Sequence, residues 1–321
     1  MEQVELRFDH ASRAAQTHTN LSALRRDETG LWLAGDETAT IEHLAWDGAV
    51  FAGQRTFHLG DYVRLPAGRE DEADIEGLAR ADGHLWAVGS HSLKRKRVKS
   101  KDPAKAARRL ATVVREENRF ILARLPLDPA SNAPLPGAVL SGADNVAAQL
   151  ADDEHLAPFL ALPGKDNGLD IEGIAVLGER VYLGLRGPVL RGWAVVLELR
   201  PEESEAGRLR LRSPYRKHFL DLGGLGVRDL CPHEGDLLLL TGPSMDLDGP
   251  VRVMRWRVAR SGDLVPADKL ETVAELPHGI GCDHPEGLAV VGEDRFMVVY
   301  DSPSPARITA AGGVLADVFP L

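Results

Sequence analysis

Asp-Ile-Glu-Gly-Leu-Ala at residues 74–79 recurs as Asp-Ile-Glu-Gly-Ile-Ala at residues 170–175 and as His-Pro-Glu-Gly-Leu-Ala at residues 284–289. Weaker copies of this motif occupy residues 19–24 and 226–231. A polar turn and a short apolar run follow each copy, which together are typical of a β-hairpin. One unit repeated along the chain indicates a repeat architecture.

The third residue of each copy measures the length of the repeat. Ser22 and Glu76 are 54 residues apart, Glu172 and Arg228 are 56 apart, and Arg228 and Glu286 are 58 apart. The gap of 96 residues between Glu76 and Glu172 exceeds this repeat by about 40, which indicates an insertion of the kind that such folds accept in their loops. The 35 residues after Glu286, taken with the first 22, have the length of one more unit. The period therefore closes a ring.

We predict an all-β fold, a single five-bladed β-propeller over residues 1–321, closed by an N-terminal strand at residues 4–8 that completes the last blade. Closure leaves only short, protected sheet edges. The alternative of six blades needs a degenerate blade within residues 126–169. An N-cap followed by an amphipathic pattern favours a helical insertion at residues 143–166 instead.

Composition excludes several classes of protein. The 321 residues include 48 acidic and 38 basic side chains, a net charge of −10, 44% hydrophobic residues and two cysteines. These values exclude a disulfide scaffold and a disordered chain. No run of about 18 apolar residues occurs, so we expect no contact with a membrane. The N-terminus lacks the pattern of a secretory signal, so we expect a cytoplasmic protein.

Equivalent motif positions of a propeller meet at one mouth of its channel, which brings Glu76, Glu172 and Glu286 together with Ser22 and Arg228. Two like charges about 6 Å apart repel by roughly 3 kcal/mol at an effective dielectric constant of about 20. A calcium or magnesium ion bound by the three glutamates, an ion pair with Arg228, or a raised glutamate pKa would relieve this repulsion. A structural role, in which each glutamate bonds the backbone of the next blade, remains open.

A second set of positions follows the second strand of each unit and differs from unit to unit, which suits recognition of an asymmetric ligand. These positions are Asp36, Ser90, Arg186, Gly242 and Asp301. We predict that Asp36, Ser90 and Asp301 contact the ligand and that Arg186 and Arg228 bind its carboxylate or phosphate. His91 is a candidate general acid or base because the pKa of histidine lies near neutrality. A hydrogen-bonding histidine and an ordinary salt bridge of Arg186 remain open.

A basic arm is expected at residues 93–118, inserted in the second blade. Residues 94–119 carry eleven Lys or Arg against three acidic residues, a charge of +8, so the rest of the chain has a charge of about −18. The pattern predicts an extended first half and a helix over residues 104–117. Such an arm suits an acidic ligand or an acidic protein partner. The absence of interleaved aromatic residues argues against nucleic acid, and an arm lying on the protein's own acidic surface remains open.

The motif at residues 74–79, the Gly-Ser-His-Ser sequence at 89–92 before the basic run, and the second motif at 170–175 resemble a bacterial family known as domain of unknown function 3616. The resemblance covers nearly the whole chain and implies the fold without an activity. The Glu-Gly motif is also similar to that of phytase-like and esterase-like propellers, in which acidic residues near the channel hold calcium. Arg228 stands where a fourth acid would be expected, which departs from a site for several calcium ions.

These patterns lead to two hypotheses of different classes. The first is a propeller that binds a small anionic ligand, such as a phosphorylated compound, together with a calcium or magnesium ion. If this protein is an enzyme, we expect a metal-dependent hydrolase of the phosphoesterase or esterase/lactonase type, with Glu76, Glu172 and His91 as catalytic residues. Since no dinucleotide or Walker motif occurs, we expect no organic cofactor. The second is a non-enzymatic interaction scaffold that uses the propeller face and the basic arm.

Overall fold

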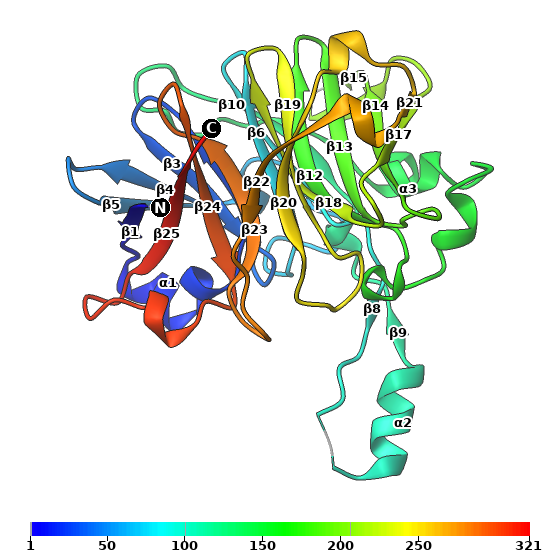
Figure 1. The fold of residues 1–321 in the computed structure, drawn as a ribbon, viewed down its shortest axis with the longest axis horizontal. Coiled ribbons are helices and arrows are strands. Elements are labelled where there is room, and N and C mark those ends of the chain that lie inside the picture. The colour runs from blue at the N-terminus through cyan, green and yellow to red at the C-terminus, as the bar shows by residue number, and fades with distance from the viewer. Residues whose placement is uncertain (1, 100, 206) are drawn as a thin grey trace.

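Strands make up the body of the molecule (Figure 1), and the five strands that carry the repeat motif contact one another in a closed ring. The computed structural model describes residues 2–99, 101–205 and 207–321. The inner strands are β2 (Leu21–Arg26), β6 (Ile75–Ala81), β12 (Asp170–Leu177), β18 (Gly226–His233) and β23 (His284–Val290). Each contacts the next in this order, and β23 contacts β2. The fold is therefore all-β and propeller-like, and the motif copies are neighbours in space.

Each inner strand begins a sheet that continues outward. The first sheet adds β3 (Gly30–Gly35), β4 (Thr40–Trp46) and β5 (Phe51–His58) to β2. The second adds β7 (His84–Gly89), β10 (Leu122–Pro126), β11 (Ala138–Leu140), β16 (Arg208–Leu211) and β15 (Pro201–Glu205) to β6. The third adds β13 (Arg180–Gly187), β14 (Trp193–Leu199), β17 (Arg216–Asp221) and β21 (Leu264–Val265) to β12. Within these three sheets the pairing is antiparallel except between β11 and β16 and between β17 and β21.

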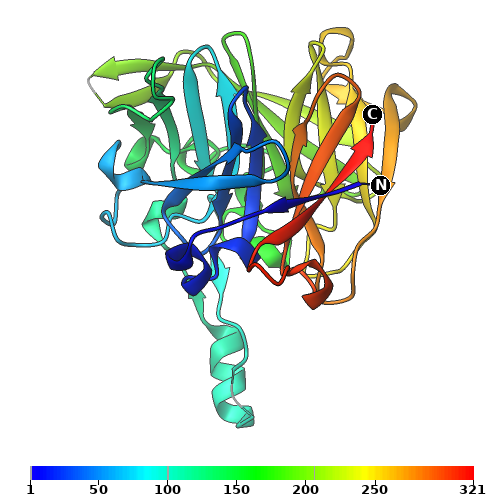
Figure 2. The ribbon, with the colours of Figure 1, turned by 90° about the vertical axis from the view of Figure 1, so that its left-hand side faces the viewer.

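The remaining strands complete the ring and join its ends. To β18 are added β19 (Asp236–Gly242), β20 (Val251–Trp256) and β22 (Leu270–Leu276). To β23 are added β24 (Arg295–Asp301), β25 (Val314–Pro320) and β1 (Glu2–Leu6). The predicted closure by the N-terminal strand is confirmed, because β1 pairs antiparallel with β25. Figure 2 shows the two termini close together on one side of the molecule.

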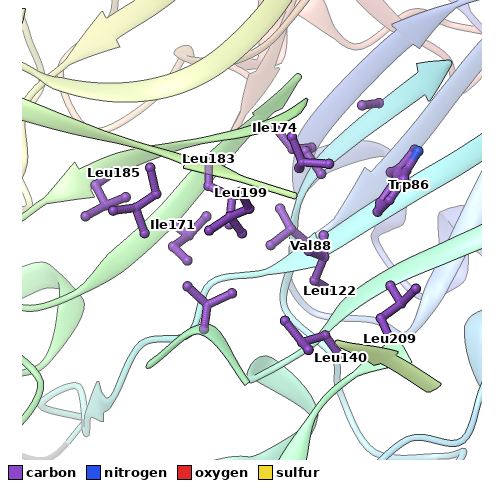
Figure 3. Packing of buried hydrophobic residues seen from close by; sticks show 14 of the residues in the cluster. Trp86, Val88, Leu122, Leu140, Ile171, Ile174, Leu183, Leu185, Leu199 and Leu209 are labelled. Atoms are coloured by element: carbon purple, nitrogen blue, oxygen red, sulfur yellow. The ribbon is translucent and has the colours of Figure 1, made fainter. Parts of the chain in front are cut away.

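The hydrophobic core lies between neighbouring sheets. Figure 3 shows how side chains of the second sheet, including Trp86, Val88 and Leu122, pack against Ile171 and Leu183 of the third. Apolar residues that alternate along each strand form these contacts, since every second side chain points to the same face. Burial of this apolar surface stabilises the ring.

A β-bulge interrupts the pairing of every inner strand at the third motif residue. The unpaired residues are Ser22, Glu76, Glu172, Arg228 and Glu286. A bulge inserts one extra residue and redirects its side chain, and bulges are common next to functional sites. The repeated motif therefore encodes a repeated bulge.

The helices are short and lie in the connections. The α-helices are α1 (His10–Ala14), α2 (Pro103–Ala111) and α3 (Val146–Gln149). The 3-10 helices are η1 (Thr17–Thr19), η2 (Leu59–Asp61), η3 (Glu117–Arg119), η4 (Gly142–Asp144), η5 (Ala157–Phe159), η6 (Gly164–Asp166), η7 (Val258–Arg260), η8 (Ala267–Lys269) and η9 (Pro305–Arg307). Among the described residues, none of these helices has the length and apolar character needed to cross a membrane.

The basic arm projects away from the ring (Figures 1 and 2). It consists of β8 (Lys94–Arg95), α2 and β9 (Val113–Val114), and β8 pairs antiparallel with β9. The predicted helix over residues 104–117 was too long, because α2 ends at Ala111 and Thr112 is extended. The β-branched run from Thr112 to Val114 favours the extended backbone that returns the chain to the ring.

Candidate functional site

Three glutamates meet at one end of the ring. Carboxylate oxygens of Glu76, Glu172 and Glu286 lie within 4.8 Å of one another. The sequence-predicted convergence is therefore present, and the bulges position it. The glycine after each glutamate lets the inner strands approach closely, because a Cβ atom on Gly173 would lie 3.0 Å from the backbone of Asp229.

The glutamates line a cavity of about 720 Å³ that contains two zones of opposite charge. Its inner zone is acidic, and the carboxylates there belong to Asp36, Asp74, Glu76, Asp170, Glu172, Glu286 and Asp301. Cations of the arm and of the neighbouring loop line its outer zone, and they include Lys96, Arg97, Lys99, Arg109 and Lys165. The cavity therefore runs from the ring to the arm.

Buried arginines neutralise only part of the inner negative charge. Arg186 donates a hydrogen bond of 2.8 Å from Nη1 to Oε1 of Glu172. Arg228 forms an ion pair with Glu286, and its Nη1 lies 3.8 Å from Oε2 of Glu172. Glu172 is only 2% exposed, yet its Oε2 has no hydrogen-bond partner in the part of the chain that is described. A buried carboxylate oxygen without a donor is costly.

Burial and neighbouring negative charges raise the pKa values of Glu76, Glu286 and Asp170. Burial, and then the charges of Asp74 and Glu172, raise the pKa of Glu76 well above its ordinary value. Burial raises the pKa of Glu286 to about 7, although Arg228 opposes this shift. Burial and the charge of Glu172 raise the pKa of Asp170 to about 7. Glu286 and Asp170 are therefore partly protonated near neutral pH.

A second group of carboxylates shares Glu76 with the first. Oxygens of Asp36, Asp74 and Glu76 also lie within 4.8 Å of one another. Burial and the neighbouring charge of Asp74 raise the pKa of Asp36 to about 8. Burial raises the pKa of Asp74 to about 6, while Arg119, whose Nη1 lies 2.7 Å from Oδ2, opposes the shift. The acidic zone thus includes carboxylates of the first three units, namely Asp36 of the first, Asp74 and Glu76 of the second, and Glu172 of the third.

An ion pair lies within the ring of inner strands. Both Arg25 and Asp229 are buried, and Nη1 and Nη2 of Arg25 each donate a hydrogen bond of 2.8 Å to the carboxylate of Asp229. Arg25 also donates to the backbone carbonyls of Ile174 at 2.8 Å and Leu288 at 2.9 Å. This arginine therefore ties together strands from opposite parts of the ring.

Three of the predicted ligand-binding residues line the cavity, namely Asp36, Arg186 and Asp301. Burial would raise the pKa of Asp301, but hydrogen bonds with His284 and Ser302 and the charge of Lys165 together outweigh burial and lower the pKa. Ser90 is not among the lining residues, and its hydroxyl lies 2.9 Å from that of Ser92. Ser90 also hydrogen-bonds the carboxylate of Asp74, which lines the acidic zone, so its predicted contact with the ligand stays a prediction.

His91 and Arg228 lie outside the lining of the cavity. His91 is buried outside the cavity lining, where its Nδ1 lies 2.8 Å from the carbonyl oxygen of Gly89 and its ring meets Phe120 edge-on. Burial lowers the pKa of His91 to about 4. Arg228 is likewise absent from the lining, and its guanidinium neutralises Glu286.

Two cavity residues were missed in the sequence. Asp74 and Asp170 are the first residues of two strong motif copies, and both line the acidic zone. Their repetition beside the glutamates was the signal that could have found them. In the third copy, His284 replaces this aspartate, and its Nε2 lies 3.3 Å from Oδ1 of Asp248.

These features define a propeller-like protein whose repeat motif lines a carboxylate-rich cavity at one end of its ring. The chain belongs to the family described as protein of unknown function DUF3616, which matches residues 20–317. The resemblance found in the sequence is thereby confirmed.

No curated protein matches the sequence. Among solved structures, glutaminyl cyclase from Myxococcus xanthus is 9% identical with a TM-score of 0.47, covering 100% of this chain and 96% of that chain. The PQQ-bound aldose sugar dehydrogenase from Streptomyces coelicolor is 11% identical with a TM-score of 0.42, covering 99% and 98%. Neither similarity transfers an activity to this chain.

Proposed function

We propose that this chain is a five-bladed propeller that binds a divalent cation, calcium or magnesium, through Glu76, Glu172 and Glu286, and with it a small anionic ligand. The five motif strands and the sheets that begin on them support the blade count. Calcium and magnesium prefer oxygen ligands, and carboxylates supply both the oxygens and the charge.

The observation that carries the proposal is the incomplete hydrogen bonding of the buried Glu172 carboxylate. Glu172 belongs to the glutamate cluster, and one of its oxygens accepts a hydrogen bond from Arg186, whereas the other, Oε2, is buried and has no hydrogen-bond donor among the described residues. A cation at this point would satisfy Oε2 and remove the repulsion between the three carboxylates. No donor bonds the carboxylate of Glu76 in the described part of the chain, so this side chain is available for the same role.

A cation bound in the cavity would also attract the negative group of a ligand. Magnesium in particular is usually held by one or two carboxylates together with waters and the phosphates of a substrate. If the ligand is a substrate, the cation would polarise its ester or phosphoester oxygen and lower the pKa of a bound water. Metal-assisted hydrolysis is therefore the reaction class that we propose, with Glu172 and Glu76 holding the cation.

Calorimetric titration with calcium and with magnesium tests the cation site. We expect one saturable binding event in the native protein and a loss of at least tenfold in affinity in Glu172→Gln. Glu293→Gln is the matched control, because Glu293 is exposed and does not line the cavity. Absence of binding at millimolar concentrations of either cation, or equal binding by Glu172→Gln, would rule out the proposed site.

A second function, docking of an acidic protein partner, is favoured by the arm. Helix α2 contains no buried residue, and Leu110 on it is 51% exposed. A helix of nine residues has marginal stability in water, and the contacts of α2 that hold it are with the strand β8 and the backbone of Arg97 in the same arm. Capture of a partner by the intact protein, and its loss on deletion of residues 94–117, would support this function if Glu172→Gln leaves capture unchanged.

A further inference from the structure

The cations of the outer zone are not used for internal ion pairs. None of the described residues places a carboxylate within ion-pair distance of Lys96, Arg97, Lys99 or Lys165, although all four line the cavity. By contrast, Arg95 pairs with Asp166 at 2.6 Å, and Lys94 lies 3.3 Å from Glu72. The inner cations of the arm thus fix the arm to the ring, and the outer ones remain available to a ligand.

Because the cavity extends from the acidic zone to the cations of the arm, a ligand that fills it must be elongated. The acidic zone on the inner strands holds the proposed cation, and the lining continues along the arm past Lys96, Arg97 and Lys99 to Arg109 on α2. A single small anion that reached the cation would leave these outer charges unmatched. An anion with charges spaced along its length would match both zones at once.

The side chains that line the cavity further limit the chemical class of the ligand. No aromatic side chain belongs to the described lining of the cavity, so bases and sugar rings have no surface on which to stack. Lysine binds phosphate as a point charge and arginine binds it through its planar fork. A hard cation held by carboxylates also binds phosphate oxygens.

From this arrangement we propose that the ligand is a linear oligophosphate, with one phosphate at the cation beside Glu172 and the following phosphates between Lys96, Arg97 and Lys99. This inference rests on the proposed cation site and adds the class of ligand. In this proposal, the arm determines which length of oligophosphate the protein prefers. The arm would select long anions over orthophosphate.

The test compares affinities for orthophosphate, pyrophosphate and tripolyphosphate in the presence of magnesium. We expect the native protein to bind tripolyphosphate at least about tenfold more tightly than orthophosphate, because each additional phosphate releases counterions from further cations. The triple variant Lys96→Gln/Arg97→Gln/Lys99→Gln should lose this preference, and the salt dependence of its affinity should become shallower.

A matched control lies on the same arm. Lys101, Lys105 and Arg108 do not line the cavity, so Lys101→Gln/Lys105→Gln/Arg108→Gln removes the same charge and should keep the preference for tripolyphosphate. Circular dichroism and magnesium titration check that both variants are folded and retain the cation site. A cation titration that fails in the native protein removes the proposed function itself.

Three results would overturn the inference while leaving the cation site intact. The first is equal affinity of the native protein for orthophosphate and tripolyphosphate. The second is an unchanged preference in the variant of Lys96, Arg97 and Lys99, or an equal loss in the control. The third is equally tight binding of a single-stranded oligonucleotide of the same charge, which would assign the outer zone to nucleic acid.

Discussion

Arg25 and Asp229, 204 residues apart, form two hydrogen bonds of 2.8 Å inside the ring of inner strands. Arg25 contacts β12 and β23 through backbone carbonyls as well, so one side chain links three inner strands besides its own. A buried ion pair is weak evidence for net stabilisation, but removal of one partner leaves an uncompensated charge. Arg25 is therefore a sensitive point for the stability of the ring.

We predict that Arg25→Met lowers the free energy of unfolding by about 3–5 kcal/mol, because Asp229 then remains buried without its partner. Arg25→Met/Asp229→Asn should recover part of this loss, since the double variant removes the unpaired charge. Urea denaturation of the native protein, of Arg25→Met, of Asp229→Asn and of the double variant measures the coupling. Losses that simply add in the double variant would contradict the importance of the pair.

The raised pKa values of the acidic zone predict the pH dependence of the metal-free protein. Folding raises the pKa of Asp36 to about 8 and those of Asp170 and Glu286 to about 7. The folded state therefore binds more protons than the unfolded state between the ordinary carboxyl pKa and about 8. Stability should fall as the pH rises from about 5 to 8, because these groups must ionise in the folded protein.

Thermal unfolding in a chelator at pH 5, 6, 7 and 8 measures this dependence. Added calcium or magnesium should raise Tm more at pH 8 than at pH 5, since the cation competes with protons for the same oxygens. A metal-free Tm that increases from pH 5 to 8 would mean that the acidic zone does not control stability in this range.

Glu76→Gln separates a cation site from a structural glutamate. Loss of this charge relieves repulsion with Asp74 and Glu172, so we predict a higher Tm than that of the native protein in a chelator at pH 8. The same variant should lose the increase in Tm on addition of the cation. Glu293→Gln is again the control. A lower Tm together with native cation binding would assign Glu76 a purely structural role.

The glycine after each motif glutamate predicts a steric effect. Gly173→Ala places a Cβ atom 3.0 Å from the backbone of Asp229 and Leu230, and we expect a loss of about 1–3 kcal/mol. Gly262→Ala is the matched control, because a Cβ atom there meets no atom within 4 Å. Chemical denaturation measures both. Equal stability of the two variants would show that the inner strands can separate without cost.

The sequence predicts the ring well because a repeat of constant length specifies it directly. Glu76, Glu172 and Glu286 occupy the same position of three copies, so closing the ring makes them neighbours whatever the details of each sheet. Pairing of the N-terminal strand with β25 follows from the same count. Positions fixed by repetition are therefore the ones that sequence reasoning places correctly.

Features that break the repeat were not predictable in this way. Asp229 occupies the place of the motif glycine in its copy, and its partner Arg25 lies in another copy, so no local pattern connects them. The segments that follow the second strands differ in sequence from unit to unit, so the other copies do not indicate that His91 is buried against Phe120. An ion pair of Arg228 with a glutamate was one of the alternatives that the sequence offered, and it is present with Glu286. The sequence does not show that this ion pair keeps Arg228 out of the cavity lining.

The most direct test of the cation site is an anomalous difference map from crystals of the protein grown with manganese, which takes the same oxygen ligands as magnesium. We predict a single strong peak bounded by the carboxylates of Glu76, Glu172 and Glu286, about 2.0–2.6 Å from their oxygens. A map without a peak at this position, in crystals in which the three carboxylates are ordered, would contradict the account.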